Sequence, residues 1–128
     1  GGEQDYASPA DLNNCFYNSS FVASNKDEKV TKFVDAYQKE YGSAPTNFCA
    51  LGYDAAMIMC QAISRAEQSG QKTGSKPYRE AIIHAIASEK VDGVTGTISY
   101  NGTGDPVKST LIIAFQDGNE VIYDTING

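Results

Sequence analysis

The segment 48–68 most constrains the fold, because its sequence predicts a long helix that is apolar on most of its sides. Its small and apolar residues surround much of the helix: Ala50, Ala55, Ala56, Met59, Ile63 and Ala66. A helix of this kind is usually buried on most sides. It is too apolar for a domain in which it would cover only one small sheet. The chain has 128 residues, which suits one compact domain and leaves no room for two full ones.

Three further helical segments follow from periodicity and capping residues. Residues 8–14 predict a short helical turn with Ser8 as its N-cap. Residues 25–42 predict an amphipathic helix that Asn25 starts and Gly42 ends. The apolar stripe of that helix comprises Val30, Phe33, Val34, Tyr37 and Tyr41. Residues 77–89 predict a helix capped by Ser75, and its inward residues are Ile82, Ile83 and Ile86.

Strands are expected at both ends of the chain. Residues 15–23 are rich in aromatic and hydroxyl side chains, and residues 96–100, 109–116 and 120–126 are also typical of strands. Asp117-Gly118 predicts a hairpin turn between the last two. One strand, three helices and three strands in this order indicate an α+β fold, or one piece of an α/β fold.

The glycine-rich run 92–109 raises the question of a phosphate-binding loop. Such a loop lies between a strand and a helix, whereas Gly93, Gly96, Gly102 and Gly104 precede a strand. Asn-Gly and Asp-Pro are turn dipeptides, so the run predicts a hairpin.

Composition and motifs exclude several classes of function. A net charge of −6 without a basic cluster argues against binding to nucleic acid or anionic membranes. The sequence contains no recognisable catalytic motif. Asp54 lies too early in its helix to pair with Glu67, and His84 is expected to be a partly exposed helix residue. No metal site and no cofactor are expected, because the sequence has no CxxC and one isolated histidine. The three cysteines cannot all pair with one another.

Two residues are candidates for ligand contact. Glu3 follows two glycines, and a carboxylate there could hold an ammonium group, although an exposed terminal acid is the simpler interpretation. Phe48 starts the long helix, where its ring could line a cleft or belong to the ordinary core.

The segments "FVDAYQKEYGSAP", "ALGYDAAMIMCQAI" and "VDGVTGTISYNGTGDPVKS" occur in an order and spacing that resemble the C-terminal part of type I periplasmic binding proteins. The most similar subgroup is the branched-chain amino acid (Leu/Ile/Val-binding-like) receptors of ABC transporters. The resemblance covers nearly the whole chain. It implies an α/β fold in which two lobes close over a ligand. This chain would be a fragment: residues 1–23 end one lobe and cross over, residues 24–110 form part of the other lobe, and residues 111–128 are the final strands.

The resemblance also implies a function and a site. The expected function is amino acid binding for an ABC importer outside the cytoplasmic membrane, in the periplasm or as a lipoprotein on a Gram-positive cell. Permease subunits would be its partners. Glu3 would meet the ligand's ammonium group and Phe48 would line its side-chain pocket, with Asp5 and Tyr6 as second choices. The alternatives are a sensing module of the same fold and a structural or adhesion domain. Uncovered apolar helix faces predict self-association of the fragment.

Overall fold

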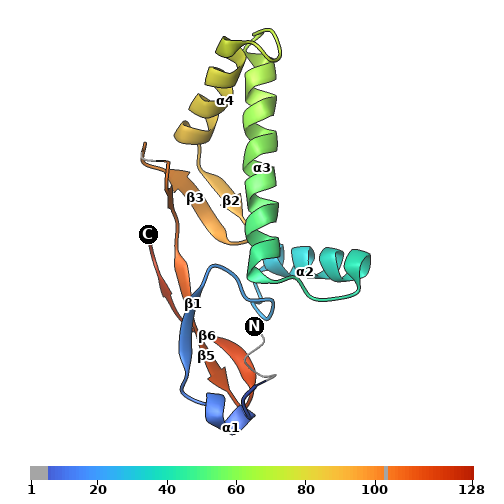
Figure 1. The fold of residues 1–128 in the computed structure, drawn as a ribbon, viewed down its shortest axis with the longest axis vertical. Helices are drawn as coiled ribbons and strands as arrows, with labels where there is room; N and C mark the ends of the chain where they lie inside the picture. The colour runs from blue at the N-terminus through green and yellow to red at the C-terminus, as the bar shows by residue number, and fades with distance from the viewer. Residues whose placement is uncertain (1–5, 103) are drawn as a thin grey trace.

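The computed structural model describes residues 6–102 and 104–128, which form an elongated body (Figure 1). The described helices are α1 (Pro9–Leu12), α2 (Glu28–Tyr41), α3 (Asn47–Gln68) and α4 (Lys76–Ser88). The described strands are β1 (Phe16–Ser19), β2 (Val91–Gly93), β3 (Gly96–Tyr100), β4 (Pro106–Val107), β5 (Thr110–Gln116) and β6 (Asn119–Ile126).

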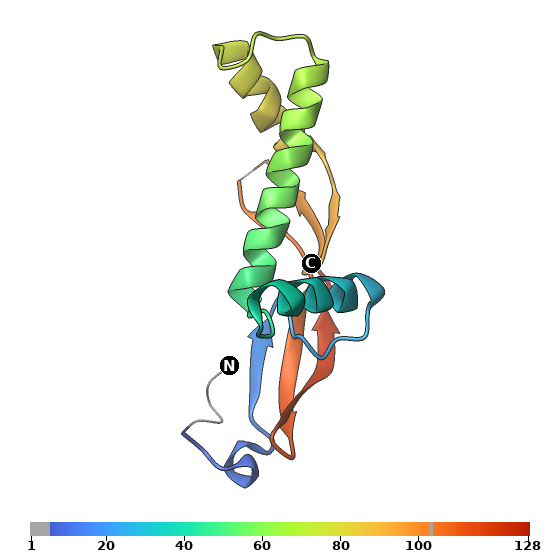
Figure 2. The same cartoon turned by 90° about the vertical axis from the view of Figure 1, so that its right-hand side faces the viewer.

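These strands form two small antiparallel sheets at different levels of the long axis (Figures 1 and 2). One sheet has the order β1-β5-β6 and the other the order β2-β3-β4. β1 pairs with β5, with Phe16 opposite Ala114, so the two ends of the described chain share one sheet. Asp117 and Gly118 form the turn from β5 to β6 with φ angles of 50° and 78°, as the Asp-Gly dipeptide predicts.

α3 follows the long axis and packs against α4 and the sheet β2-β3-β4 (Figure 1). Ile58 of α3, Val91 of β2 and Ile98 of β3 form a buried cluster there. Ile86 of α4 and Tyr100 of β3 pack against this cluster. Burial of these apolar side chains fixes the far part of α3 to its neighbours.

A second cluster fixes the beginning of α3. Phe21, which follows β1, packs with Val30 of α2, Ala50 of α3 and Val94. Phe33 of α2 extends the cluster, with its ring 5.8 Å from that of Phe21. The N-terminal end of α3 is therefore held beside the connection from β1 to α2.

The predicted helix ends are confirmed at three positions. Ser8 caps α1, and its hydroxyl and the Asp11 side chain form a capping box. The Ser75 hydroxyl accepts a hydrogen bond from the backbone of Tyr78 and caps α4. Gly42 ends α2 in the left-handed conformation with φ 75°.

The predicted N-cap of α2 was wrong by two residues. Asp27 is the cap, and its carboxylate accepts a hydrogen bond of 2.9 Å from the Lys29 amide. The Asn25 side chain instead accepts a hydrogen bond of 2.9 Å from the Asp27 amide. Asn25 therefore shapes the turn before the helix, a role that Asn performs as readily as capping.

The expectation that α3 is buried on most sides was also wrong. Its buried residues form one stripe: Ala50, Asp54, Ile58, Ala62 and Ala66. Four of the small and apolar residues that surround the helix are exposed: Ala55, Ala56, Met59 and Ile63. Ile83 of α4 is likewise 66% exposed. The described elements cover one side of α3, and the apolar side chains on its other sides are exposed to solvent.

The predicted strands lie where the sequence indicates, but their lengths differ from the prediction. The strand expected over 15–23 ends at Ser19, because the Ser19 hydroxyl bonds to the backbone of Phe21 and turns the chain out of the sheet. The three-residue strand β2 was not predicted. The glycine-rich run contains the turn between β3 and β4, with Tyr100 opposite Pro106, as expected.

Candidate functional site

A cavity of about 430 Å³ lies between the sheet β1-β5-β6 and the N-terminal end of α3. Tyr17, Ser19 and residues 21–23 line it on the sheet side. Residues 44–48 line it on the helix side, and Glu120 lines it at the start of β6. The cavity therefore combines apolar walls with a few polar groups, which is typical of small-molecule sites.

Phe48 lies in the wall of this cavity. It is the second residue of α3, just after the N-cap Thr46 and Asn47, and its side chain is 83% exposed. Within the described chain Phe48 is thus a cavity residue and not part of the core. Its role in ligand binding stays a prediction.

The other predicted site residues are not brought together by the described chain. Glu3 and Asp5 lie outside the described residues. Tyr6 is 93% exposed and does not line the cavity.

Glu120 is a cavity residue that the sequence did not reveal. Tyr17 donates a hydrogen bond of 2.7 Å from its hydroxyl to Glu120 Oε1. Ser24 also donates to the Glu120 backbone carbonyl at 3.2 Å. A single acid after a hairpin turn is unremarkable in a sequence. Its position against Tyr17 depends on strand pairing between residues about a hundred positions apart.

The first turn of α3 presents polar backbone groups at the opposite wall. Cys49 N–H bonds to the Thr46 hydroxyl at 3.4 Å, and Ala50 N–H bonds to the Thr46 carbonyl at 3.2 Å. The N–H groups of Asn47 and Phe48 have no acceptor within residues 6–102 and 104–128. The positive end of the helix dipole lies at this wall.

Cys49 has an unusual environment beside the same turn. Its Sγ lies 3.2 Å from the Thr46 hydroxyl and 3.2 Å from the Tyr37 hydroxyl. These hydrogen bonds, first that of Thr46 and then that of Tyr37, lower the pKa of the Cys49 thiol. All three cysteines are free.

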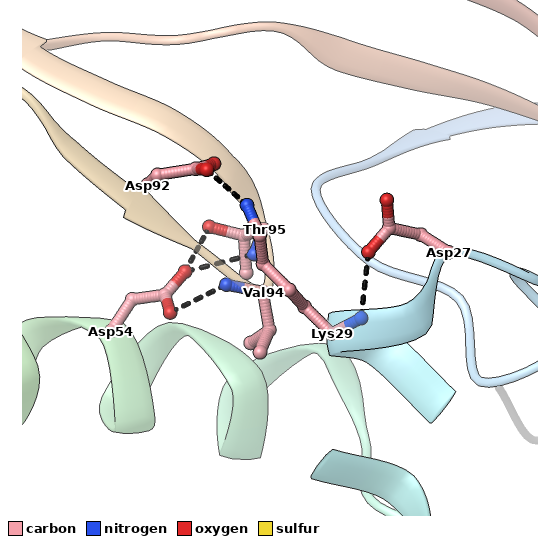
Figure 3. Close-up of polar contacts among 6 residues, drawn as sticks. All are labelled: Asp27, Lys29, Asp54, Asp92, Val94 and Thr95. Atoms are coloured by element: carbon pink, nitrogen blue, oxygen red, sulfur yellow. Dashed lines mark hydrogen bonds and ion pairs between the residues drawn. The ribbon is translucent and has the colours of Figure 1, made fainter. Parts of the chain in front are cut away.

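Asp54 is the most completely buried charged residue of the described chain, at 1% exposure, and it has a structural role (Figure 3). Its Oδ1 accepts a hydrogen bond of 2.8 Å from Val94 N. Its Oδ2 accepts hydrogen bonds from Thr95 N at 2.8 Å and from the Thr95 hydroxyl at 2.6 Å. A Cβ at Gly93 would overlap this carboxylate, so the site requires glycine there. Asp54 thereby attaches the turn between β2 and β3 to α3.

Two lysines complete this polar group. Lys108 donates a hydrogen bond of 2.5 Å to the Thr95 hydroxyl, and burial lowers the pKa of its ammonium group while Asp54 opposes that shift. Lys29 forms an ion pair with Asp92 at the surface (Figure 3). The Asp54 carboxylate is thus bonded on both oxygens by protein groups, which indicates a structural role and not a ligand site.

No cluster of three His, Cys, Asp or Glu side chains within residues 6–102 and 104–128 could hold a metal ion. None of the helices in this part of the chain is long and apolar enough to span a membrane. His84 is exposed on α4, as expected.

Known proteins resemble this chain along most of its length. The family model described as periplasmic binding protein matches residues 2–119. A leucine binding protein from Thermotoga maritima has a similar structure, with 26% identity and a TM-score of 0.68 over 91% of this chain and 31% of that chain. Curated proteins gave no match to this chain.

Two further solved structures are less than 25% identical and share the fold alone. The branched-chain amino acid transporter substrate binding protein from Streptococcus pneumoniae, in complex with isoleucine, has 23% identity and a TM-score of 0.72 over 99% of this chain and 34% of that chain. A solute binding protein from R. palustris, in complex with benzoate, has 17% identity and a TM-score of 0.77 over 100% of this chain and 34% of that chain.

The chain thus spans about a third of the length of these solved proteins. The likeness confirms the predicted fold class, an α/β segment of a two-lobe fold.

Proposed function

The chain belongs to the periplasmic binding protein family, and from this we propose that it forms part of an extracytoplasmic solute-binding protein of an ABC importer. Its ligand is an amino acid of the branched-chain type, or a similar small solute, held between two lobes. The family match over residues 2–119 carries the proposal. The similarity to a leucine binding protein supports the ligand class, and the similar solved proteins are solute-binding proteins, not enzymes.

The geometry of the cavity is compatible with such a ligand. A volume of about 430 Å³ lies within the range of small-molecule pockets. Val22, Pro45 and Phe48 offer an apolar wall for a side chain. Glu3 is the proposed partner of the ammonium group, with Asp5 and Tyr6 as further candidates. Closure of the second lobe would exclude water and strengthen these contacts.

The proposed importer function requires a location outside the cytoplasmic membrane, in the periplasm or at a Gram-positive cell surface, where permease subunits receive the solute. Uptake of radiolabelled leucine by cells that lack the gene tests this placement. Loss of uptake is expected for an importer. Unchanged uptake together with a changed transcriptional or signalling response would favour a sensing module of the same fold.

The ligand test is calorimetric titration of the two-lobe protein that contains this chain against a panel of amino acids and benzoate. Phe48→Ala should weaken leucine binding by about tenfold, because the ligand loses part of its apolar wall. The matched control is Ile83→Ala, which truncates an exposed apolar side chain on α4 outside the cavity and should leave affinity unchanged. Absence of binding by every member of the panel would contradict the proposed function.

A further inference from the structure

We propose that Lys108 is a positioning residue for ligand binding. Its hydrogen bond to Thr95 anchors one side of a hinge between the two halves of the described chain, and so limits how far the cavity lined by Phe48 can open. The inference rests on the proposed function, in which two lobes close over a solute. Lys108 does not line that cavity, so it acts on ligand binding through the backbone and not by contact.

The described chain consists of two bodies that pack mainly within themselves. The helical body comprises α2, α3, α4 and the sheet β2-β3-β4, and the terminal sheet comprises β1-β5-β6 with α1 (Figure 1). Within residues 6–102 and 104–128 the chain crosses between these bodies twice, after β1 and before β5. The cavity lined by Phe48 lies between the two bodies, because Tyr17 and Glu120 line it from the terminal sheet. Bending at the crossings therefore changes the width of this cavity.

The two crossings lie side by side. Ser19, the last residue of β1, is opposite Leu111 of β5, and the Thr110 hydroxyl donates to the Ser19 carbonyl at 3.3 Å. The first crossing is anchored by apolar burial, because Phe21 is 4% exposed and belongs to the apolar cluster at the beginning of α3. The chain therefore passes from the terminal sheet to the helical body at Ser20.

The second crossing has a polar anchor. Lys108 Nζ donates a hydrogen bond of 2.5 Å to the Thr95 hydroxyl, and that hydroxyl donates to Asp54 Oδ2 at 2.6 Å. Asp54 is buried in α3 and also accepts two backbone hydrogen bonds, so Lys108 is attached to a fixed part of the helical body. The next residue lies on the other side of the hinge, since the Ser109 hydroxyl donates to Asn127 Oδ1 at 3.4 Å and Asn127 follows β6. The passage between the bodies therefore falls between Lys108 and Ser109.

The space beside the crossings allows the two bodies to bend. A cavity of about 230 Å³ lies there, and both crossings line it, through Ser20 and Ser109. A close-packed contact would resist a change of angle, whereas a hollow one permits it. The exposed hydrogen bond from the Ser24 hydroxyl to the Glu120 carbonyl spans the two bodies, and water can replace it. Without the bond of Lys108 the second crossing loses its anchor, and the free protein samples a wider range of angles.

The test is the distance between spin labels on Cys15 and Cys60 in the two-lobe protein that carries Cys49→Ala. Cys15 precedes β1 and Cys60 lies in α3, so these exposed thiols report on the angle between the bodies. Lys108→Met keeps an apolar stem but cannot donate, so it should broaden the distance distribution of the ligand-free protein. Saturating L-leucine should narrow the distribution again. The dissociation constant for leucine should rise about fivefold, because a smaller fraction of the free protein has the binding-competent angle.

Two variants separate the hydrogen bond from a loss of charge or of packing. Lys72→Met removes the same charge from the exposed loop after α3 and should leave the distances and the affinity unchanged. Thr95→Ser keeps the hydroxyl that accepts from Lys108 and should also resemble the unmodified protein.

A ligand-free distribution in Lys108→Met as narrow as that in Lys72→Met would overturn the role of Lys108. Equal broadening in Lys108→Met and Thr95→Ser would also overturn it. Failure of the unmodified protein to bind any amino acid would refute the proposed function and the effect on affinity with it. The ligand-free distances would in that case still decide whether Lys108 restrains the hinge.

Discussion

Cys49 shows how two neighbouring side chains, Thr46 and Tyr37, change the chemistry of a third. It is the third residue of α3, where backbone N–H groups and the helix dipole favour a negative charge. The hydroxyls of Thr46 and Tyr37 can both donate to its sulfur, which stabilises the thiolate. The same contact with Cys49 raises the pKa of the Tyr37 hydroxyl. Cys49 is therefore expected to ionise more easily than an ordinary thiol.

We predict that alkylation of Cys49 by iodoacetamide has its half-maximal rate at a pH below the ordinary thiol range. A lowered pKa means that a larger fraction of Cys49 is thiolate at any pH below the ordinary thiol range. Tyr37→Phe should move the midpoint upward, whereas Tyr41→Phe, on the same helix, should not. Peptide mass spectrometry across a pH series measures all three cysteines at once. A Cys49 midpoint within or above the ordinary thiol range would contradict the prediction.

The sequence permits a partial prediction of the candidate site. Residues whose role depends on neighbours in the sequence were predictable, and residues whose role depends on distant parts of the chain were not. Phe48 was identifiable as a possible cleft residue because it stands at the start of an obvious helix. Glu120 was not, because its place in the cavity comes from the register of three strands and from Tyr17, far away in the chain. The importance of Asp54 depends on amides 40 and 41 positions further along. Side-chain chemistry is visible in a sequence, but the partners that give it a role are not.

At the scale of elements, Asp54 is the joint between α3 and the turn after β2. It satisfies two backbone N–H groups and one hydroxyl of that turn, and Lys108 extends the contact to the residues between β4 and β5. One buried carboxylate therefore links a helix, a hairpin and the strand that leads into the other sheet. The apolar cluster around Ile58 packs against the same elements but does not satisfy these polar groups.

Asp54→Ala should lower the free energy of unfolding by about 3 kcal/mol or more, since it leaves buried donors unsatisfied and removes the counter-charge of Lys108. Asp35→Ala, at an exposed position of α2, is the control and should stay within about 0.5 kcal/mol of the unmodified protein. Urea unfolding followed by circular dichroism measures both. Similar midpoints for the two variants would show that the Asp54 network does not stabilise the fold.

The elements themselves were predictable where a local rule governs them. Ser8, Ser75 and Gly42 end helices through contacts within a few residues, and Asp117-Gly118 forms a turn by its own backbone preference. β2 was missed because three residues are too few for a periodic pattern, and it exists through pairing with β3. The exposed sides of α3 were mispredicted for a related reason. Composition shows that a helix can be buried all round, but only its neighbours decide whether it is.

At the scale of the whole molecule, the chain exposes more surface than its mass requires. Its accessible surface is 8357 Å², whereas a compact protein of 13.7 kDa exposes about 6,600 Å². Large apolar side chains contribute to the excess, and they gather on α3 and β6: Tyr53, Met57, Met59, Ile63, Ile122, Tyr123 and Ile126. The excess is about twice the ~800 Å² that one partner buries in a standard protein interface.

We therefore expect the isolated 128-residue chain to self-associate through the exposed apolar side of α3. Burying this surface against a second copy removes it from water, and no charged residue of the described α3 interrupts it between Met57 and Ile63. Met59→Glu combined with Ile63→Glu should shift the association midpoint to about tenfold higher concentration or more, because two charges would have to be desolvated. Gln71→Glu, which adds a charge in the exposed loop after α3, is the control. Size-exclusion chromatography with light scattering over a concentration series measures the effect. A monomer at every concentration would mean that this surface is tolerated in water, and the excess area would then reflect only the elongated shape of the chain.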